Sequence, residues 1–214
     1  MLFSGKETIE QAKQNTLDNL LAEVPEDTDI EKVLAKQDQF IDYLDTLDID
    51  KFFANFKVLG TEIPVEFELN GNEIIGRVDL IIEDKNNGET IIVDHKSSGH
   101  FLKKDGTPLK SKLDQFNDYK KQLYIYAMGV KQKFGISAQS LAWNHFLDKG
   151  AITEIPYRED ECEETKNWVL ETINLIENDQ EFAAKKSFLW CNRLCSFRND
   201  CLYKEMEDED AELS

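Results

Sequence analysis

The sequence is short of several features, and each shortage excludes a class of protein. Its 214 residues contain no run of about eighteen apolar residues, the length that a membrane-spanning helix needs. The opening residues, "MLFSGKETIE", lack the apolar centre of a signal peptide. We therefore expect a soluble, intracellular protein with no membrane partner. At this length the chain is expected to form one domain of ordinary size, with at most a small appendage.

Cysteine and histidine are also scarce, with four and three residues. Three of the cysteines lie close together in "CNRLCSFRNDC", a grouping more typical of ligands than of the dispersed disulfides of a small secreted protein. The histidines are His95, His100 and His145. We expect His100 to lie in an exposed loop and His145 in a strand, with neither of them a metal ligand.

Basic residues are few relative to acidic ones, 25 against 43, and the net charge of −18 argues against nonspecific binding to nucleic acid by the chain as a whole. One stretch departs from this balance. Residues 96–133 contain nine lysines and three acids, and they include the candidate DNA-binding residues Lys103, Lys104 and Lys110. The alternative is a solvated helix face with a lysine-rich loop.

Hydrophobic periodicity changes twice along the chain. The first fifty residues are expected to form two helices separated by the turn "VPEDTD". Residues 61–69 then alternate between apolar and polar side chains, which is typical of a half-buried strand. Residues 72–84 and 89–97 predict two further strands, joined by turns at "NG" and "KNNG" into an antiparallel meander.

The second half of the chain returns to helical spacing. Residues 112–135 predict a helix that ends at Gly135 and whose apolar stripe faces the sheet. The stripe consists of Phe116, Leu123, Val130 and Phe134. Two strands, at 138–148 and 151–158, and a helix at about 160–178 complete the predicted elements.

This order of elements predicts a mixed α/β (α+β) fold. Its central mixed sheet consists of the antiparallel three-strand meander plus two further strands, and helices flank it. We expect an N-terminal helical segment at 1–56, the core at 57–184, a cysteine segment at 185–204 and a disordered acidic tail at 205–214.

Charged residues end the third predicted strand, "IIVDHKSSG". Because side chains alternate between the two faces of a strand, Asp94 and Lys96 share one face and His95 points to the other. An edge strand that runs out into solvent with an incidental charge pair would also explain this pattern. Asp79, in "GRVDLI" on the neighbouring strand, favours a functional site instead.

Two carboxylates on adjacent strands of a meander can converge on one side of the sheet. Mg²⁺ takes oxygen ligands, and one or two carboxylates with waters or phosphate oxygens are enough to hold it. Asp79 and Asp94 are therefore candidate metal ligands. Lys96 would orient or deprotonate an attacking water, or neutralise the charge that builds on a phosphate.

With these residues in order, the sequence resembles the PD-(D/E)XK nuclease superfamily, in particular its RecB-like branch, which includes CRISPR-associated and phage exonucleases. The matching motifs are "GRVDL" for G-x-x-D, "IIVDHKSSG" for D-x-K-T/S and "QLYIYA" for Q-x-x-x-Y, and "FLWCNRLCSFRNDC" matches the C-terminal segment of the iron–sulfur members. The resemblance covers about residues 57–203. It implies a restriction-endonuclease-like core in the cytoplasm of a bacterial or phage-infected cell.

The resemblance also implies roles for individual residues. Asp79 and Asp94 would bind Mg²⁺ or Mn²⁺, with the backbone carbonyl of His95 completing the shell, and Lys96 would be the catalytic lysine. The remaining candidates lie on the first strand and on the helix. Gln122 and Tyr126, four residues apart on one helix face, would position the scissile strand. Glu62 would be the acid of the first strand, with Glu66 as its competitor.

For the cysteine segment, the resemblance favours a [4Fe–4S] cluster held by Cys191, Cys195 and Cys201. Zinc or an empty site are the alternatives, because thiolates select either metal. Cys162 is the available fourth cysteine, although an ordinary buried cysteine is the commoner role for such a residue.

The implied activity is that of a metal-dependent DNA nuclease, an exonuclease that acts on linear or single-stranded DNA in recombination, repair or phage DNA metabolism. A helicase or a recombination factor would be its protein partner, because the sequence contains no nucleotide-binding motor motif.

Two departures from the RecB-like pattern favour another hypothesis. The histidine expected on an N-terminal helix and the first cluster cysteine are both missing, so the chain resembles a member that lacks its first segment. With the net charge of −18, this favours a catalytically weak nuclease-fold module that binds DNA ends or a protein partner.

Overall fold

A computed structural model of the chain describes residues 3, 5–19, 30–97, 99–103, 106–148, 150–181, 191 and 195–197. Contacts divide the chain into two units, residues 1–170 and 171–214, and the sheet and the site described below belong to the first. The domain boundaries expected near residues 184 and 204, and the expected disorder of the acidic tail, lie outside the described residues. Among the helices that the structure describes, none is both long and apolar enough to cross a membrane.

Three helices precede the sheet: α1 (Ile9–Asn19), α2 (Ile30–Thr46) and α3 (Ile49–Asn55). The two helices predicted for the first fifty residues are confirmed as α1 and α2, whereas α3, which begins at Ile49, was not predicted. Asp48 starts the additional helix, because its side chain accepts the backbone N–H of Lys51 at 2.9 Å and so caps α3.

Five strands and two longer helices follow in the predicted order. They are β1 (Phe56–Leu69), β2 (Asn72–Asp84), β3 (Thr90–Lys96), α4 (Leu113–Phe134), β4 (Ser140–His145), β5 (Ala151–Pro156) and α5 (Glu159–Asn178). Single 3-10 turns occur at Lys110–Lys112 and Phe146–Asp148.

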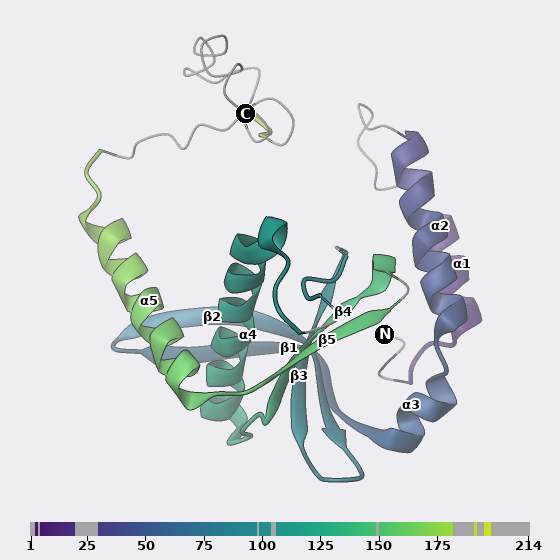
Figure 1. Cartoon of the computed structure of the whole chain (residues 1–214), viewed down its shortest axis with the longest axis horizontal. Coiled ribbons are helices and arrows are strands. Elements are labelled where there is room, and N and C mark those ends of the chain that lie inside the picture. The colour runs from purple at the N-terminus through teal and green to yellow at the C-terminus, as the bar shows by residue number, and fades with distance from the viewer. Residues whose placement is uncertain are drawn as a thin grey trace. The chain divides into compact units, whose positions relative to one another are not determined.

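The strands form one five-stranded sheet in the order β1-β2-β3-β4-β5. All neighbours are antiparallel except β3 and β4, which are parallel and are connected through α4. Helix α4 lies on one side of the sheet and α3 on the other (Figure 1). The predicted mixed sheet, a meander plus two further strands with flanking helices, is confirmed.

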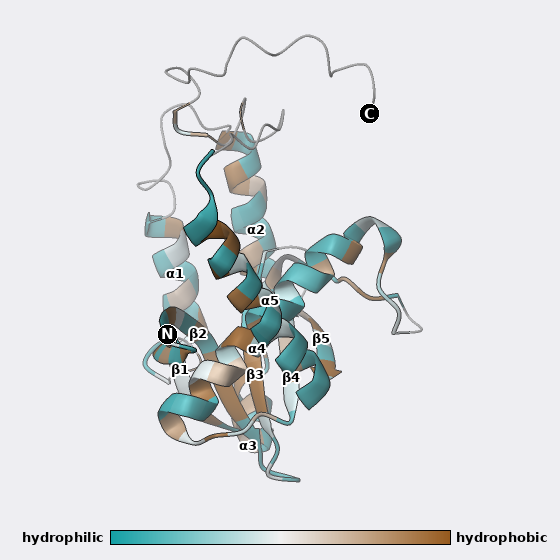
Figure 2. Ribbon diagram, turned by 90° about the vertical axis from the view of Figure 1, so that its left-hand side faces the viewer, coloured by the Kyte–Doolittle hydropathy of each residue, from teal (hydrophilic) through white to brown (hydrophobic). Residues whose placement is uncertain are grey.

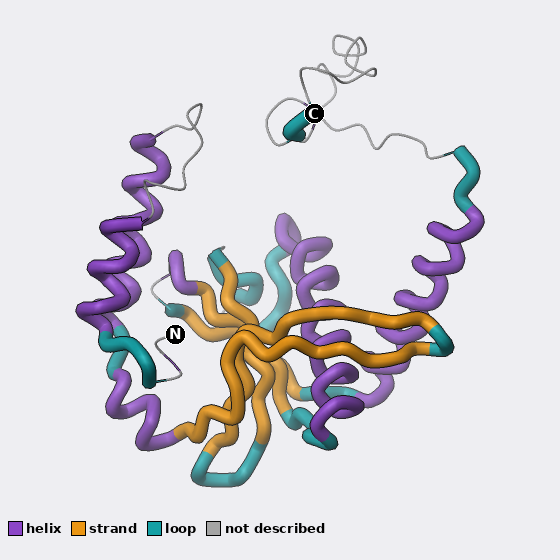
Figure 3. The backbone as a smooth tube through the Cα atoms, turned by 180° about the vertical axis from the view of Figure 1, so that it is seen from behind, coloured by secondary structure: helices purple, strands orange, loops and turns teal. Residues whose placement is uncertain are grey.

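The hairpin of β1 and β2 is the longest feature of the sheet (Figure 3). At its tip Asn70 and Gly71 both have positive φ, 50° and 83°, as the predicted Asn-Gly turn requires. The C-terminal half of β1 packs against α4, where the side chain of Gln132 bonds both the N–H and the carbonyl of Glu68. The hairpin is thus stabilised by contacts with α4 as well as by the hydrogen bonds between its own two strands.

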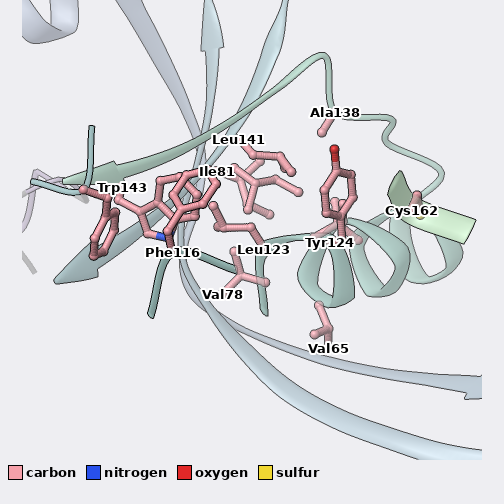
Figure 4. Close-up of a cluster of buried hydrophobic side chains, with 14 residues drawn as sticks. Val65, Val78, Ile81, Phe116, Leu123, Tyr124, Ala138, Leu141, Trp143 and Cys162 are labelled. Carbon is pink, nitrogen blue, oxygen red and sulfur yellow. The ribbon is translucent and has the colours of Figure 1, made fainter. Parts of the chain in front are cut away.

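The main core fills the space between α4 and the sheet (Figure 4). Leu123, Tyr124 and Val130 of α4 are fully buried there, whereas the predicted fourth member of the stripe, Phe134, is 45% exposed. That part of the prediction was wrong because Phe134 is the last residue of α4, and Gly135, with φ 70°, turns the chain away.

A second cluster lies on the opposite face of the sheet. Leu80, Ile82 and Val93 are buried there and are covered by aromatic rings that include Phe52 of α3 and Phe3. The central strands are accordingly rich in hydrophobic residues (Figure 2), and their buried side chains belong to the clusters on the two faces. Because both faces are covered, Asp79 of β2 and Asp94 of β3 lie beside a buried core rather than at an open edge.

Candidate active site

Glu62 and Asp79 lie opposite each other on β1 and β2. Thr61 pairs with Leu80 and Ile63 with Val78, so the register places Glu62 across from Asp79. Glu62 has a positive φ of 52°, which is uncommon for a residue with a side chain inside a strand. Such an outlier costs on the order of 1 kcal/mol and is commonest at functional sites.

Asp79 and Asp94 are neighbours across the next pair of strands. Leu80 pairs with Val93, so continuing the antiparallel register by one residue brings Asp79 next to Asp94. Their electrostatic effect on each other is direct, since the charge of Asp79 is one of the causes that raise the pKa of Asp94. The structure therefore brings the two predicted metal ligands together at one point of the sheet.

Asp94 is buried, with 3% of its surface exposed, and it contacts Lys96 on the same face of β3. Lys96 Nζ lies 2.7 Å from Asp94 Oδ2, within ion-pair distance. Burial raises the pKa of Asp94 from 3.8 to about 6, and the Lys96 contact only partly offsets this effect. The carboxylate would therefore gain from a further cation beside it.

Helix α4 holds the other side of Lys96. Lys96 Nζ donates a hydrogen bond to Gln122 Oε1 at 2.8 Å, and Gln122 Nε2 donates to the hydroxyl of Tyr126, also at 2.8 Å. The ammonium lies 4.0 Å from the centre of the Tyr119 ring. The predicted lysine, glutamine and tyrosine are thus connected by consecutive hydrogen bonds.

The pKa of the Tyr126 hydroxyl shows how the acids gather around it. Burial raises this pKa most, and the charges of Asp94, Asp79 and Glu62 raise it further, in that order. The charges of all three carboxylates therefore reach this hydroxyl. The candidate site therefore combines three acids, one lysine and the pair from α4.

His95 points to the opposite face of β3, as the alternation predicts. Its backbone N–H donates to Asp79 Oδ2 at 2.7 Å, which fixes that carboxylate. Its ring stacks on Phe3, with centroids 5.6 Å apart, and Nδ1 lies 3.1 Å from Asn144 Nδ2. Burial lowers the pKa of the imidazole.

A cleft of about 930 Å³ opens beside these residues. Glu62, Asp79 and His95 line its wall on the sheet, and residues of α1 and α2 line the wall that faces them. Glu66, the alternative acid of β1, is exposed and is not among the lining residues. The structure thus places Glu62 beside Asp79, while Glu66 lies further along the strand.

The site meets the requirements of a hard divalent cation. Asp79 and Asp94 are neighbours on adjacent strands, and the buried Asp94 carboxylate has only Lys96 as a cationic contact among the described residues. In the part of the chain that the structure describes, no three acidic, histidine or cysteine side chains are arranged to hold a metal. A cation here would therefore rely on Asp79 and Asp94 and complete its shell with backbone, water or substrate oxygens.

The structure describes three of the four cysteines that the sequence proposes as cluster or zinc ligands. Cys191 and Cys195 are free and half-buried, and Cys201 lies outside the described residues. Cys162 is buried in the main core, and burial raises the pKa of its thiol. The cluster or zinc site therefore stays a prediction.

The lysine-rich stretch divides into engaged and exposed residues. Lys112 donates to the carbonyl of Gly99 at 3.0 Å and fixes the loop that follows β3. Lys103 and Lys110 are exposed, and Lys104 lies outside the described residues. These two exposed lysines lie in the segment between β3 and α4.

Sequence reasoning missed Tyr119 and Asn144, which contact Lys96 and His95. It also missed Tyr43, which contacts Asn144. Tyr119 lies one helical turn before Gln122, so an i, i+3 relation on α4 was a usable signal. Asn144 and Tyr43 gave no such signal, because they are 101 residues apart in sequence although Asn144 Nδ2 donates to the Tyr43 hydroxyl at 2.8 Å.

Comparison with known proteins identifies the class. A family model described as the PD-(D/E)XK nuclease superfamily matches residues 3–202, so the chain belongs to this superfamily. Its members are nucleases that act on DNA and typically use a divalent metal. A search of curated proteins finds no match.

Two solved structures are similar at low identity. One, described as "Putative exonuclease" from Eubacterium rectale, is 16% identical with a TM-score of 0.47, and the match covers 89% of this chain and 68% of that one. The other, named SSO0001, is 18% identical with a TM-score of 0.35, and the match covers 90% of this chain and 95% of that one. At these scores neither structure adds to the argument about function.

Proposed function

We propose that the protein is a metal-dependent deoxyribonuclease of the RecB-like branch, an exonuclease that hydrolyses linear or single-stranded DNA. The observation that carries the proposal is the convergence of Asp79, Asp94 and Lys96 with Gln122 and Tyr126 in a chain of the PD-(D/E)XK nuclease superfamily. The proposed setting is the cytoplasm of a bacterial or phage-infected cell, with a separate helicase or recombination factor as partner.

Asp79 and Asp94 are the proposed ligands of Mg²⁺ or Mn²⁺, with the carbonyl of His95 as a third. When bound, the metal supplies charge neutralisation at the phosphate and lowers the pKa of a coordinated water. Asp79 is prepared for this role because the N–H of His95 fixes one of its oxygens. Asp94 is prepared by burial, since a desolvated carboxylate gains from a cation.

Lys96 is the proposed catalytic lysine. Its ammonium contacts both Asp94 and Gln122, so two partners rather than one ion pair fix its position. In this position it orients the attacking water or stabilises the charge that develops on the phosphate. Gln122 and Tyr126 fix the ammonium and contact the scissile strand, and Glu62 adds a third carboxylate beside Asp79.

Phosphate rather than base recognition suits this arrangement, because carboxylates with a metal and a lysine contact the backbone of a nucleic acid. Lys103, Lys104 and Lys110 are the proposed DNA contacts outside the site. The acidic remainder of the surface would restrict binding to this side of the molecule.

The C-terminal cysteines are proposed to hold a [4Fe–4S] cluster, with Zn²⁺ as the alternative occupant. Cys191, Cys195 and Cys201 supply three thiolates, and Cys162 or a non-cysteine residue the fourth ligand. The cluster would stabilise the cysteine segment, residues 185–204.

The test uses linear and covalently closed circular single-stranded DNA, incubated with the protein in a chelator and then with millimolar Mg²⁺ or Mn²⁺ added back. We expect nucleotide release only from the linear form and only with metal. Cleavage of the circle at the same rate would exclude an exonuclease, and release in chelator would exclude the metal-dependent site.

A second function is favoured by the net charge of −18 and by the lack of a third metal-binding side chain among the described residues. It is a catalytically weak module that binds DNA ends or a protein partner. In the same assay this module would retain linear DNA without releasing nucleotides, whichever metal is added.

A further inference from the structure

A continuous series of contacts links α2 to the predicted metal site. The Tyr43 hydroxyl of α2 accepts a hydrogen bond from Asn144 Nδ2 at 2.8 Å. The same amide nitrogen lies 3.1 Å from His95 Nδ1. The backbone N–H of His95 in turn donates to Asp79 Oδ2 at 2.7 Å. Three contacts thus connect a helix of the N-terminal segment to a proposed metal ligand.

The first member of this series is rigidly held. Tyr43 is 4% exposed, and its ring packs against Phe40 and Phe146, with centroids 6.0 Å and 6.2 Å away. It also lies so close to Gly150 that a Cβ there would stand 2.8 Å from the Tyr43 ring. The hydroxyl is therefore presented to Asn144 from a fixed position.

Asn144 is buried, and its orientation depends on these two contacts. It lies opposite His95 in the parallel pairing of β3 and β4, so the two side chains share one face of the sheet. Its amide nitrogen serves both Tyr43 and His95, while Oδ1 makes no hydrogen bond to any described residue. Removing either contact would leave the amide without a defined direction.

The His95 ring is held from two sides, by Asn144 at Nδ1 and by Phe3 on its face, where the two rings are inclined by only 17°. A ring fixed in this way restricts the residue whose N–H holds Asp79 and whose carbonyl is the proposed third ligand. Residues that contact the ligands of a metal fix the orientation of those ligands. Replacing such residues typically changes the metal affinity by about 10–100-fold.

We propose that Asn144 is a positioning residue for metal binding and that Tyr43 acts through it, so that the N-terminal helical segment helps to shape the metal site. This inference rests on the proposed function, because it requires Asp79 and His95 to bind the metal. Neither Asn144 nor Tyr43 touches substrate or metal in this scheme. Both act through His95.

The test compares Mn²⁺ affinity, measured by titration calorimetry without DNA, in Asn144→Ala, Tyr43→Phe and the double variant. Tyr43→Phe keeps the packed ring and removes only the hydroxyl. Tyr157→Phe is the matched control, because the Tyr157 hydroxyl bonds Glu159 at 3.1 Å and lies outside the series. Melting temperatures in chelator check that each variant is folded.

We expect Asn144→Ala to weaken Mn²⁺ binding about 10-fold or more, and Tyr43→Phe by about 3-fold to 10-fold, as the loss of one hydrogen bond predicts. The double variant should bind no more weakly than Asn144→Ala, because residues that act through one series are not additive. The Mn²⁺ concentration for half-maximal cleavage should rise by the same factors, while the rate at saturating Mn²⁺ stays near that of the wild type.

Wild-type affinity in folded Tyr43→Phe and Asn144→Ala would overturn the inference, and so would additive losses, which indicate two independent structural effects. The proposed function is judged separately with Asp79→Asn. If the wild type binds Mn²⁺ and Asp79→Asn does not, that function stands whatever the Asn144 result. Binding that does not depend on Asp79 would overturn both.

Discussion

Replacing Asp94 by asparagine is expected to stabilise the metal-free protein while abolishing metal-dependent cleavage. The folded-state pKa of Asp94 is about 6, against an ordinary value of 3.8, and this shift already includes the favourable contact with Lys96. Because the folded protein binds this proton more tightly than the unfolded chain, wild-type stability falls as the pH rises from about 4 to about 6 and then levels off. Asparagine cannot ionise and avoids the loss.

The size of the effect follows from the shift. A difference of about two pKa units corresponds to about 3 kcal/mol, so Asp94→Asn should exceed the wild type by up to about 3 kcal/mol near pH 8. Near pH 5 the advantage should fall to about 1.5 kcal/mol, because part of the wild type is then protonated. Little solvent screening applies, since Asp94 is 3% exposed.

Urea denaturation in a chelator at the two pH values measures this difference. Asp118→Asn on α4 is the matched control, since that side chain is 71% exposed and its replacement should change stability by less than about 0.5 kcal/mol. A mutant that is less stable than the wild type near pH 8, or a difference independent of pH, would refute the reasoning and make Asp94 a structural residue.

Three further predictions concern other parts of the chain. Neutralising Lys103 and Lys110 together should weaken binding to single-stranded DNA and lower the slope of log K against log salt concentration by about 1.4. An unchanged slope would show that these lysines do not contact DNA phosphates. Gly150→Ala should cost about 2 kcal/mol or more in thermal unfolding, because Gly150 has φ 70° and a Cβ would meet the ring of Tyr43; an unchanged melting temperature would contradict this. Protein purified without oxygen should be brown, with absorbance near about 400 nm, and Cys195→Ser should lose the colour; colourless wild type without stoichiometric iron or zinc would exclude both metals.

Much of the fold follows from local rules. The two-residue period of β1 to β3 and the Asn-Gly turn predict the meander, because side-chain alternation and positive φ are properties of neighbouring residues. The same alternation predicts that Asp94 and Lys96 share a face. The four-residue spacing of Gln122 and Tyr126 predicts that they meet, and they do so at 2.8 Å.

The rest depends on tertiary structure. Glu62 and Glu66 lie on the same face of an ideal strand, and only the register with β2 and the positive φ of Glu62 distinguish them. The contact between Tyr43 and Asn144 joins residues on α2 and β4 that no local pattern relates. Helix α3 was missed because its seven residues are too few for a clear helical period.

The central claim, that Lys96 and the acids beside it form a nuclease site, is tested most directly by one measurement. End-labelled linear single-stranded DNA is digested at saturating Mn²⁺ by the wild type, by Lys96→Ala and by the control Lys57→Ala, whose lysine is exposed on β1. We predict loss of label with the wild type and the control, and a rate lower by about 100-fold or more with Lys96→Ala, as for removal of one catalytic group that stabilises the transition state. Equal rates for Lys96→Ala and the wild type would contradict the account.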